Sequence, residues 1–141
     1  MLDVQFLERC NATLTEAYRL LGEAEVNSVH YDLYRSAIIK EFEVILEQSG
    51  KLLKKVLLPY FSSKNALDKL TFKDIFRYAS NHDLLTLDEV ERWLLYRDNR
   101  NLTAHDYGFD LAEETLPIIP EFIVDVARLI QVIKENNATK R

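Results

Sequence analysis

The sequence is poor in residues that break helices and in residues that cross-link a chain. Its 141 residues include three glycines, three prolines and one cysteine, Cys10. So few turn-forming residues argue against a β-sandwich or β-barrel, which needs many tight turns. A lone cysteine can form neither an internal disulfide nor a cysteine metal site, so we expect Cys10 to be a small helix residue in a reduced compartment.

Signals for export and membrane insertion are also missing. No uninterrupted apolar run approaches the roughly 18 residues of a membrane span. The N-terminus carries Asp3 and Glu8 where a signal peptide would be basic. With 48% apolar and 29% charged residues, the composition is that of a folded chain. We therefore expect one cytoplasmic domain over residues 1–141, with a frayed tail at 136–141 and no membrane partner.

Charge is unevenly distributed along the chain. The formal net charge is −5, yet residues 51–77 carry seven basic and two acidic side chains. The net charge disfavours general polyanion binding, so a nucleic acid would need a local site. A solvated helix face explains the basic block most simply. Two other roles stay open for Lys51, Lys54 and Lys55: they could line an RNA path or contact an acidic partner.

Apolar residues recur at helical spacing along most of the chain. We predict helices over residues 4–21, 31–58, 72–81 and 87–104, then a segment from residue 111 and a final helix reaching residue 135. Long amphipathic helices with short connections indicate an all-α fold, an antiparallel up-and-down bundle of four to five helices. The predicted core stripe of the second helix includes the residues Tyr34, Ile38, Phe42, Ile45, Leu52 and Val56.

Short signals set the expected ends of these helices. Gly22, Pro59 and Gly108 act as breaks, and Pro117 with Pro120 divides the last segment. The pairs Thr71/Asp74 and Thr86/Glu89 are typical of helix starts, and Asp110 can cap the segment that follows it. Gly50 marks a bend or a close helix approach.

The fourth predicted helix changes character along its length. Its apolar stripe of Leu87, Val90 and Leu94 continues at helical spacing as Asp98, Asn101 and His105. Buried polar groups need partners, so this helix end should face a cleft, an interface or solvent. On the neighbouring stripe, Trp93 precedes Arg97, Arg100, Ala104 and Tyr107. We expect Trp93 to be a core or interface anchor, and Arg97 and Asp98 to form a local ion pair or dimer contacts.

This polar end holds the residue types needed for RNA cleavage without a metal or other cofactor. Arg100 can hold a phosphate, and His105 can take and give a proton near neutral pH. Asn101 can orient the histidine or the ribose. Arg100 and His105 are five residues apart, so about 140° around and ~7.5 Å along an ideal helix. Either the helix unwinds after Asn101, or a two-fold dimer combines residues from two chains.

The spacing alone is weak evidence. Arg77 and His82 have the same offset, and we interpret that pair as a surface coincidence. Helix-end residues that satisfy one another at an interface would also explain the polar end of the fourth helix.

A longer pattern adds to this spacing. The segment RNLTAHDY resembles the Arg-x4-His-x-Tyr motif of the HEPN superfamily. The second helix, IIKEFEVILEQSGKLLKK, is similar to that of the branch called nucleotidyltransferase substrate-binding proteins. Arg77 with Ala79, and Trp93 seven residues before the motif arginine, also match that branch. The resemblance extends over about residues 3–135.

The resemblance implies a small dimeric helical bundle that is the toxin of a pair with a minimal nucleotidyltransferase antitoxin. By position, Arg100 and His105 would form the endoribonuclease site, which acts on tRNA or mRNA, with Asn101 as the polar neighbour. Tyr107 resembles the residue to which the partner attaches AMP. Asp106 departs from many relatives by placing a negative charge beside the histidine. A non-catalytic subunit that presents a nucleotide or substrate, or a helical adaptor, stays an alternative.

Overall fold

Every regular element among the described residues is helical, which confirms the all-α fold. A computed structural model describes residues 2–105 and 109–139, and the side chains of residues 2–100 and 112–137. The α-helices are α1 (Gln5–Glu23), α2 (Val29–Leu57), α3 (Lys64–Asp68), α4 (Phe72–Asn81), α5 (Leu87–His105), α6 (Phe109–Thr115) and α7 (Ile119–Thr139). Short 3-10 turns, η1 (Leu58–Tyr60) and η2 (Leu116–Ile118), contain Pro59 and Pro117.

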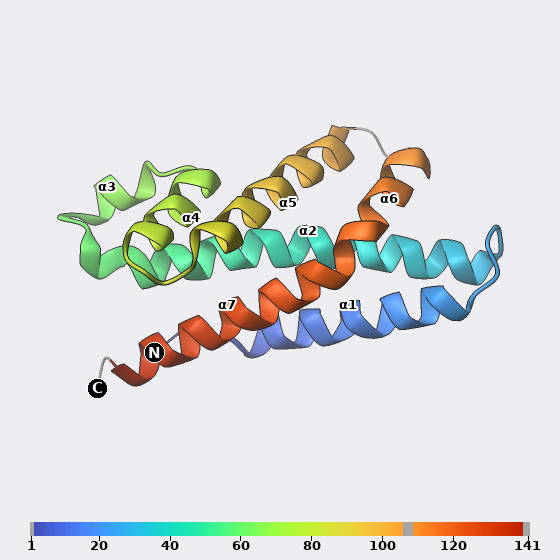
Figure 1. Ribbon diagram of the computed structural model, residues 1–141, viewed down its shortest axis with the longest axis horizontal. Coiled ribbons are helices and arrows are strands. Elements are labelled where there is room, and N and C mark those ends of the chain that lie inside the picture. Colours follow the sequence, from blue (N-terminus) through green and yellow to red (C-terminus); the bar gives the residue numbers. More distant parts are fainter. Residues whose placement is uncertain (1, 106–108, 140–141) are drawn as a thin grey trace.

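The helices form an elongated bundle around α2 (Figure 1). α1 runs antiparallel to α2 along its length, and α7 lies beside α1, so that Leu2 contacts Asn137. α4 and α5 pack along the other side of α2, while α3 lies at the end of the bundle. The C-terminal part of α5 diverges from α2, and α6 returns the chain toward it (Figure 1). This arrangement carries the C-terminal half of α5, residues 97–105, here called its polar half, away from α2.

Side-chain caps fix where the internal helices begin. Thr71 and Asp74 form a reciprocal capping box at α4, with Asp74 N–H donating to Thr71 Oγ1 at 3.2 Å. The same exchange joins Thr86 and Glu89 at α5, over 2.9 and 3.1 Å. These bonds satisfy amide groups that have no partner inside the helix. The sequence therefore predicted the starts of α4 and α5 correctly.

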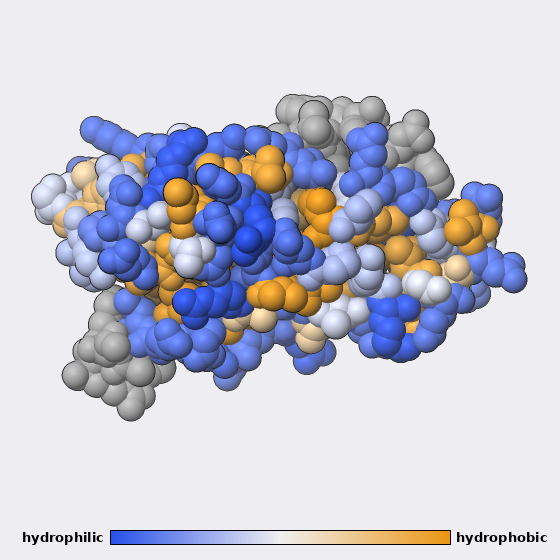
Figure 2. Space-filling model, viewed as in Figure 1, coloured by the Kyte–Doolittle hydropathy of each residue, from blue (hydrophilic) through white to orange (hydrophobic). Residues whose placement is uncertain are grey.

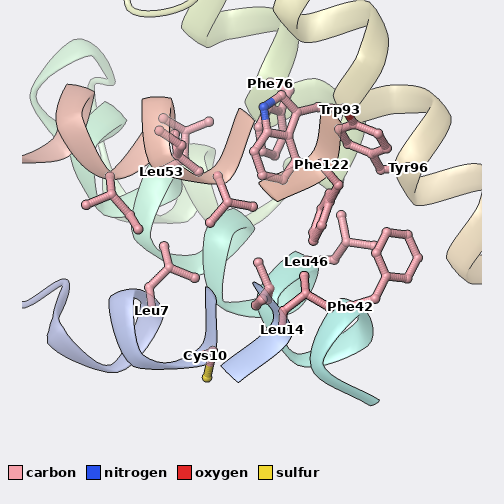
Figure 3. Close-up of a cluster of buried hydrophobic side chains, with 14 of the residues drawn as sticks. Leu7, Cys10, Leu14, Phe42, Leu46, Leu53, Phe76, Trp93, Tyr96 and Phe122 are labelled. Atoms are coloured by element: carbon pink, nitrogen blue, oxygen red, sulfur yellow. The ribbon is translucent and has the colours of Figure 1, made fainter. Parts of the chain in front are cut away.

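The core is built on a cluster of aromatic rings between α2, α4, α5 and α7 (Figure 3). Trp93 stacks on Phe76 with ring centroids 4.8 Å apart and meets Phe122 edge-on at 5.7 Å. Phe42 contacts the same Phe122 ring at 4.7 Å. Aromatic pairs in such offset and edge-on geometries stabilise a core beyond the area they bury. The expectation that Trp93 anchors the core is confirmed.

Gly50 allows α4 to approach α2 closely, one of the two roles expected of it. A Cβ atom at this position would lie 2.9 Å from Cδ2 of Phe72, closer than packed atoms approach. Cys10 is buried on α1, as expected of a small helix residue, and burial together with the charge of Glu41 raises the pKa of its thiol to about 11. Both residues therefore serve packing.

Several helix ends and core positions differ from the sequence predictions. α1 continues through Gly22 to Glu23, and α6 begins at Phe109, so Asp110 lies inside its first turn instead of capping it. On α2, Tyr34 and Leu52 are only half-buried, while Leu46 and Leu53 are fully buried. A stripe of one residue per turn is narrower than the face that two flanking helices cover, so neighbouring leucines are buried as well.

α7 extends further than predicted, to Thr139. Asn137 exchanges two hydrogen bonds with the backbone of Leu2, over 3.1 and 2.9 Å. The start of the chain thus holds this last part of α7, a contact between residues far apart in sequence that helical periodicity does not reveal.

Candidate functional site

α5 remains helical to His105, so it does not unwind after Asn101. Of the two expected ways to bring Arg100 and His105 together, a local unwinding is therefore wrong. On one regular helix their Cα atoms are about 140° apart around the axis and ~7.5 Å apart along it. The side chains of Asn101 and His105, and all of Tyr107, lie outside the described residues. A site shared by two chains stays a prediction.

The buried face of α5 differs from the predicted stripe. Leu87 is 64% exposed and Leu94 is half-buried, whereas Val90, Trp93 and Tyr96 are buried. The large aromatic side chains dominate the area that α5 can bury and so set which face turns inward. Arg100 is half-buried and lies seven residues, or two turns, after Trp93, on the inward face.

Asp98 therefore does not continue a buried stripe. Its carboxylate is exposed and accepts a hydrogen bond from Lys73 of α4 at 2.6 Å. The guanidinium of Arg97 lies over the Phe72 ring, 5.1 Å from its centre. The predicted ion pair between Arg97 and Asp98 is thus replaced by two contacts to the start of α4. Those contacts hold α4 against the polar half of α5.

A buried carboxylate fixes α5 on α7, and sequence reasoning missed it. Asp125 is 3% exposed and accepts two hydrogen bonds from Arg92, both 2.9 Å long, and one from the Tyr96 hydroxyl. Burial and the hydrogen bond to Asp125 raise the pKa of Tyr96, which therefore stays protonated. A paired, hydrogen-bonded charge is tolerated inside a protein. The signal was present in the sequence, because Asp125 interrupts the apolar stripe of α7.

Two more polar contacts hold the helices on either side of residues 106–108. Thr115, which is buried, donates a hydrogen bond from Oγ1 to Asn99 Oδ1 at 2.7 Å. On α6, the Glu113 carboxylate accepts from the Tyr31 hydroxyl at 2.8 and 2.9 Å and from Arg35 at 3.4 Å. Burial and the bond to Glu113 raise the pKa of Tyr31. No motif in the sequence indicated these contacts.

The two residues of the second Arg-x4-His pair, Arg77 and His82, contact different neighbours. Arg77 is exposed and forms an ion pair with Asp74 at 3.6 Å. The His82 ring stacks on Tyr60 with centroids 4.0 Å apart. Both contacts belong to the surface of the α4 end. The interpretation of this pair as a surface coincidence agrees with these contacts.

A shallow groove of about 510 Å³ runs beside the polar half of α5, between it and the start of α7. It is lined by Arg92, Leu95, Tyr96, Asp98, Asn99, Pro117, Ile118 and Glu121. Figure 2 shows one face of the molecule, on which orange groups are scattered among blue ones. Among the residues with described side chains, no three acidic, histidine or cysteine groups gather in a way that could hold a metal ion. Within the same part of the chain, no helix is long and apolar enough to cross a membrane.

Comparisons with known proteins agree with the resemblance found in the sequence. The model of the family described as nucleotidyltransferase substrate binding protein like matches residues 2–135. The chain belongs to this family. It is therefore a member of the HEPN branch that its second helix and RNLTAHDY segment resemble.

Individual relatives support the same assignment. A Haemophilus influenzae protein described as the probable ribonuclease HepT is 28% identical over 110 residues, which are 78% of this chain and 74% of that protein. A Thermus thermophilus protein of known crystal structure is 27% identical, with a TM-score of 0.71 over 90% of this chain and 98% of its own.

A second solved structure shows the fold. It is a Haemophilus influenzae protein described as revealing the fold of a substrate binding domain of a nucleotidyltransferase. Its TM-score is 0.78 at 23% identity, over 94% of this chain and 99% of its own. The helical bundle is thus the common fold of these proteins.

Proposed function

We propose that this protein is an endoribonuclease of the HEPN type and the toxin of a pair with a nucleotidyltransferase. The observation that carries the proposal is the unbroken course of α5 to His105, with Arg100 half-buried on the inward face of the same helix end. Similarity to a probable ribonuclease over 78% of the chain supports the assignment.

The chemistry assigns one role to each motif residue. His105 takes the proton from a ribose 2′-hydroxyl, whose oxygen then attacks the adjacent phosphorus. The bond from phosphorus to the 5′-oxygen breaks, and that oxygen receives the proton that His105 took. Arg100 stabilises the negative charge that develops on the phosphoryl oxygens. Asn101 orients the histidine or the ribose. The products are a 2′,3′-cyclic phosphate and a 5′-hydroxyl, and no metal ion takes part.

A homodimer would bring Arg100 and His105 together although they point in different directions on one helix. Because α5 stays regular, Arg100 and His105 of one chain point about 140° apart. Two copies related by a two-fold axis can place Arg100 of one chain beside His105 of the other. The composite site then needs no distortion of α5.

Tyr107 is the proposed point of regulation. The partner nucleotidyltransferase attaches AMP to its hydroxyl, which adds a phosphate charge and a bulky group two residues from His105. Like charges repel, so the modified chain excludes the RNA phosphate from Arg100. Tyr107→Phe should keep RNA cleavage and lose silencing by the partner.

The decisive experiment is RNA cleavage by the purified protein, without its partner and with divalent metals removed. We expect cyclic-phosphate ends from wild type and at least a roughly 100-fold loss in His105→Ala. Thermal melting and gel filtration confirm that the variant folds and dimerises. Absence of cleavage by wild type whose mass shows no AMP would contradict the proposal for the RNAs tested.

Mixing two inactive variants tests the shared site. Arg100→Ala and His105→Ala, each inactive alone, should regain about a quarter of wild-type activity once their chains exchange, because half the dimers then contain one intact site. A mixture that stays inactive, although mass spectrometry shows exchanged dimers, would place the site within one chain.

A second candidate function is a non-catalytic subunit that presents a nucleotide or substrate to the nucleotidyltransferase. The family description favours it, and the groove beside Arg92 and Asn99 offers a surface. This second function predicts that His105→Ala weakens binding of the partner or the nucleotide, and that neither wild type nor the variant cleaves RNA. Calorimetric titration with the nucleotide and the partner separates the two functions.

A further inference from the structure

Exposed aromatic rings and exposed lysines lie on segments at one end of the bundle: the end of α2, η1, α3 and the end of α4 (Figure 1). We call a set of residues on these segments, Tyr60, Tyr78, His82, Lys55, Lys64 and Lys69, the aromatic–lysine surface; ring contacts join Tyr60 to His82 and Tyr78 to Phe61. It lies at the end of the molecule opposite the α1–α2 connection (Figure 1). None of these residues belongs to the motif on α5, so the proposed ribonuclease chemistry leaves this surface without a role.

The rings of this surface are ordered by one another and yet accessible. Tyr60 stacks on His82 with an interplanar angle of 17° and is still 48% exposed. Tyr78 meets Phe61 edge-on at 5.0 Å and is 37% exposed. Exposed aromatic rings held in place are stacking platforms, because every nucleic acid base has an aromatic face. A base that stacks on Tyr60 would extend the existing pair of rings.

The positive charges of the lysines on this surface are not taken up by ion pairs within the described part of the chain. Lys55, Lys64 and Lys69 are exposed and form no ion pair with any residue whose side chain the structure describes. Asp68, the acidic group of α3, is bound by Lys54 at 2.9 Å, and its pKa is lowered by that contact and by the charge of Lys64. The residues named for the surface carry three lysines and no acidic group, in a chain whose net charge is −5. Lysines beside aromatic platforms are the usual combination for single-stranded nucleic acids.

We propose that the aromatic–lysine surface binds single-stranded RNA outside the cleavage site. The proposal rests on the proposed function, in which RNA is the substrate. α4 is ten residues, roughly 15 Å, long and leads from His82 of this surface to Lys73, which binds Asp98 on the polar half of α5. RNA that stacks on Tyr60 can therefore follow α4 toward Arg100. An acidic protein segment would use the lysines but gain little from the stacked rings.

The first test measures RNA affinity after removal of the stacking platform. A fluorescent single-stranded RNA of roughly 16 nucleotides is titrated with His105→Ala protein, so that the probe stays intact. Adding Tyr60→Leu should raise the Kd about tenfold. The matched control is Phe6→Leu, another exposed ring that lies on α1, and it should leave the Kd within about twofold of the parent.

The second test measures the phosphate contacts. The slope of log affinity against log salt should fall by about 0.7 for Lys64→Gln, the value for one phosphate contact on a single strand. Lys40→Gln, an exposed lysine in the middle of α2, should leave the slope unchanged. Equal slopes for the two variants would contradict a phosphate contact at Lys64.

Cleavage kinetics separate this proposal from the ribonuclease assignment. Tyr60→Leu should raise KM for the long RNA and leave kcat/KM for a dinucleotide unchanged, because the dinucleotide cannot reach both sites. If the protein binds RNA in a way that depends on Tyr60 but cleaves no RNA, the RNA-binding surface is supported and the ribonuclease assignment is contradicted. Unchanged RNA affinity in Tyr60→Leu would overturn the RNA-binding surface, as would a loss confined to binding of the nucleotidyltransferase.

Discussion

The same Arg-x4-His spacing occurs on α4 and on α5, in two different surroundings. On α4, Arg77 is exposed and pairs with Asp74, while His82 follows the helix end and stacks on Tyr60. On α5, Arg100 is half-buried, and the helix continues through His105. A spacing fixes only the angle between two residues on a helix. The environment on each helix decides whether those residues can form a site.

Catalysis should separate the two pairs most strongly. His105→Ala removes the proposed general base and should lower the cleavage rate by a factor of about 100 to 10,000. His82→Ala loses only its ring contact with Tyr60 and should leave cleavage of a dinucleotide within about twofold of wild type. Initial rates for both variants at matched folding give the comparison. Equal losses would mean that the histidine of α5 has no special role.

The anchor beneath the α5 pair should have the next largest effect. Asp125→Ala leaves Arg92 and the buried Tyr96 hydroxyl without their common acceptor, so unfolding should become easier by about 2–4 kcal/mol. Urea denaturation measures this change. Asp125→Asn is the matched control, since its amide oxygen still accepts a hydrogen bond, and it should lose less. A loss below about 0.5 kcal/mol for the alanine variant would contradict the anchoring role.

A smaller effect is expected at the contact between α5 and the end of α6. Thr115→Val keeps the shape of the side chain but removes the hydrogen bond to Asn99, which should cost about 1 kcal/mol. Thr13→Val, at an exposed position of α1, is the control with the same chemical change. Thermal melting of both variants tests the contribution. A melting temperature unchanged in Thr115→Val would show that the bond to Asn99 does not stabilise the fold.

The smallest effect should come from the arginine of the α4 pair. Arg77→Ala removes an exposed ion pair with Asp74 and should change stability by less than about 0.5 kcal/mol. The capping box of Thr71 and Asp74 remains intact in this variant. Denaturation at low and high salt checks the prediction. A loss above about 1 kcal/mol that salt does not screen would mean that Arg77 has a structural role beyond this pair.

Much of the fold could be predicted from the sequence because its signals are local. The capping residues Thr71 and Thr86 and the punctuation by Pro59 and Pro117 act within one helical turn, and each marked an element correctly. The face of α5 could not be assigned from periodicity, since Leu87 and Trp93 offered competing stripes. Packing against Phe76 and Phe122 selected the stripe of Trp93.

The candidate site divides in the same way. The sequence by itself determined the helices, their caps, and the presence of Arg100 and His105 five residues apart, because these depend on the order of residues along one helix. Only the tertiary structure decided that Asp125 of α7 holds Arg92 and Tyr96, and that Tyr31 and Glu113 join α2 to α6. Such partners lie tens of residues apart, and a buried polar group finds its partner by how the helices pack.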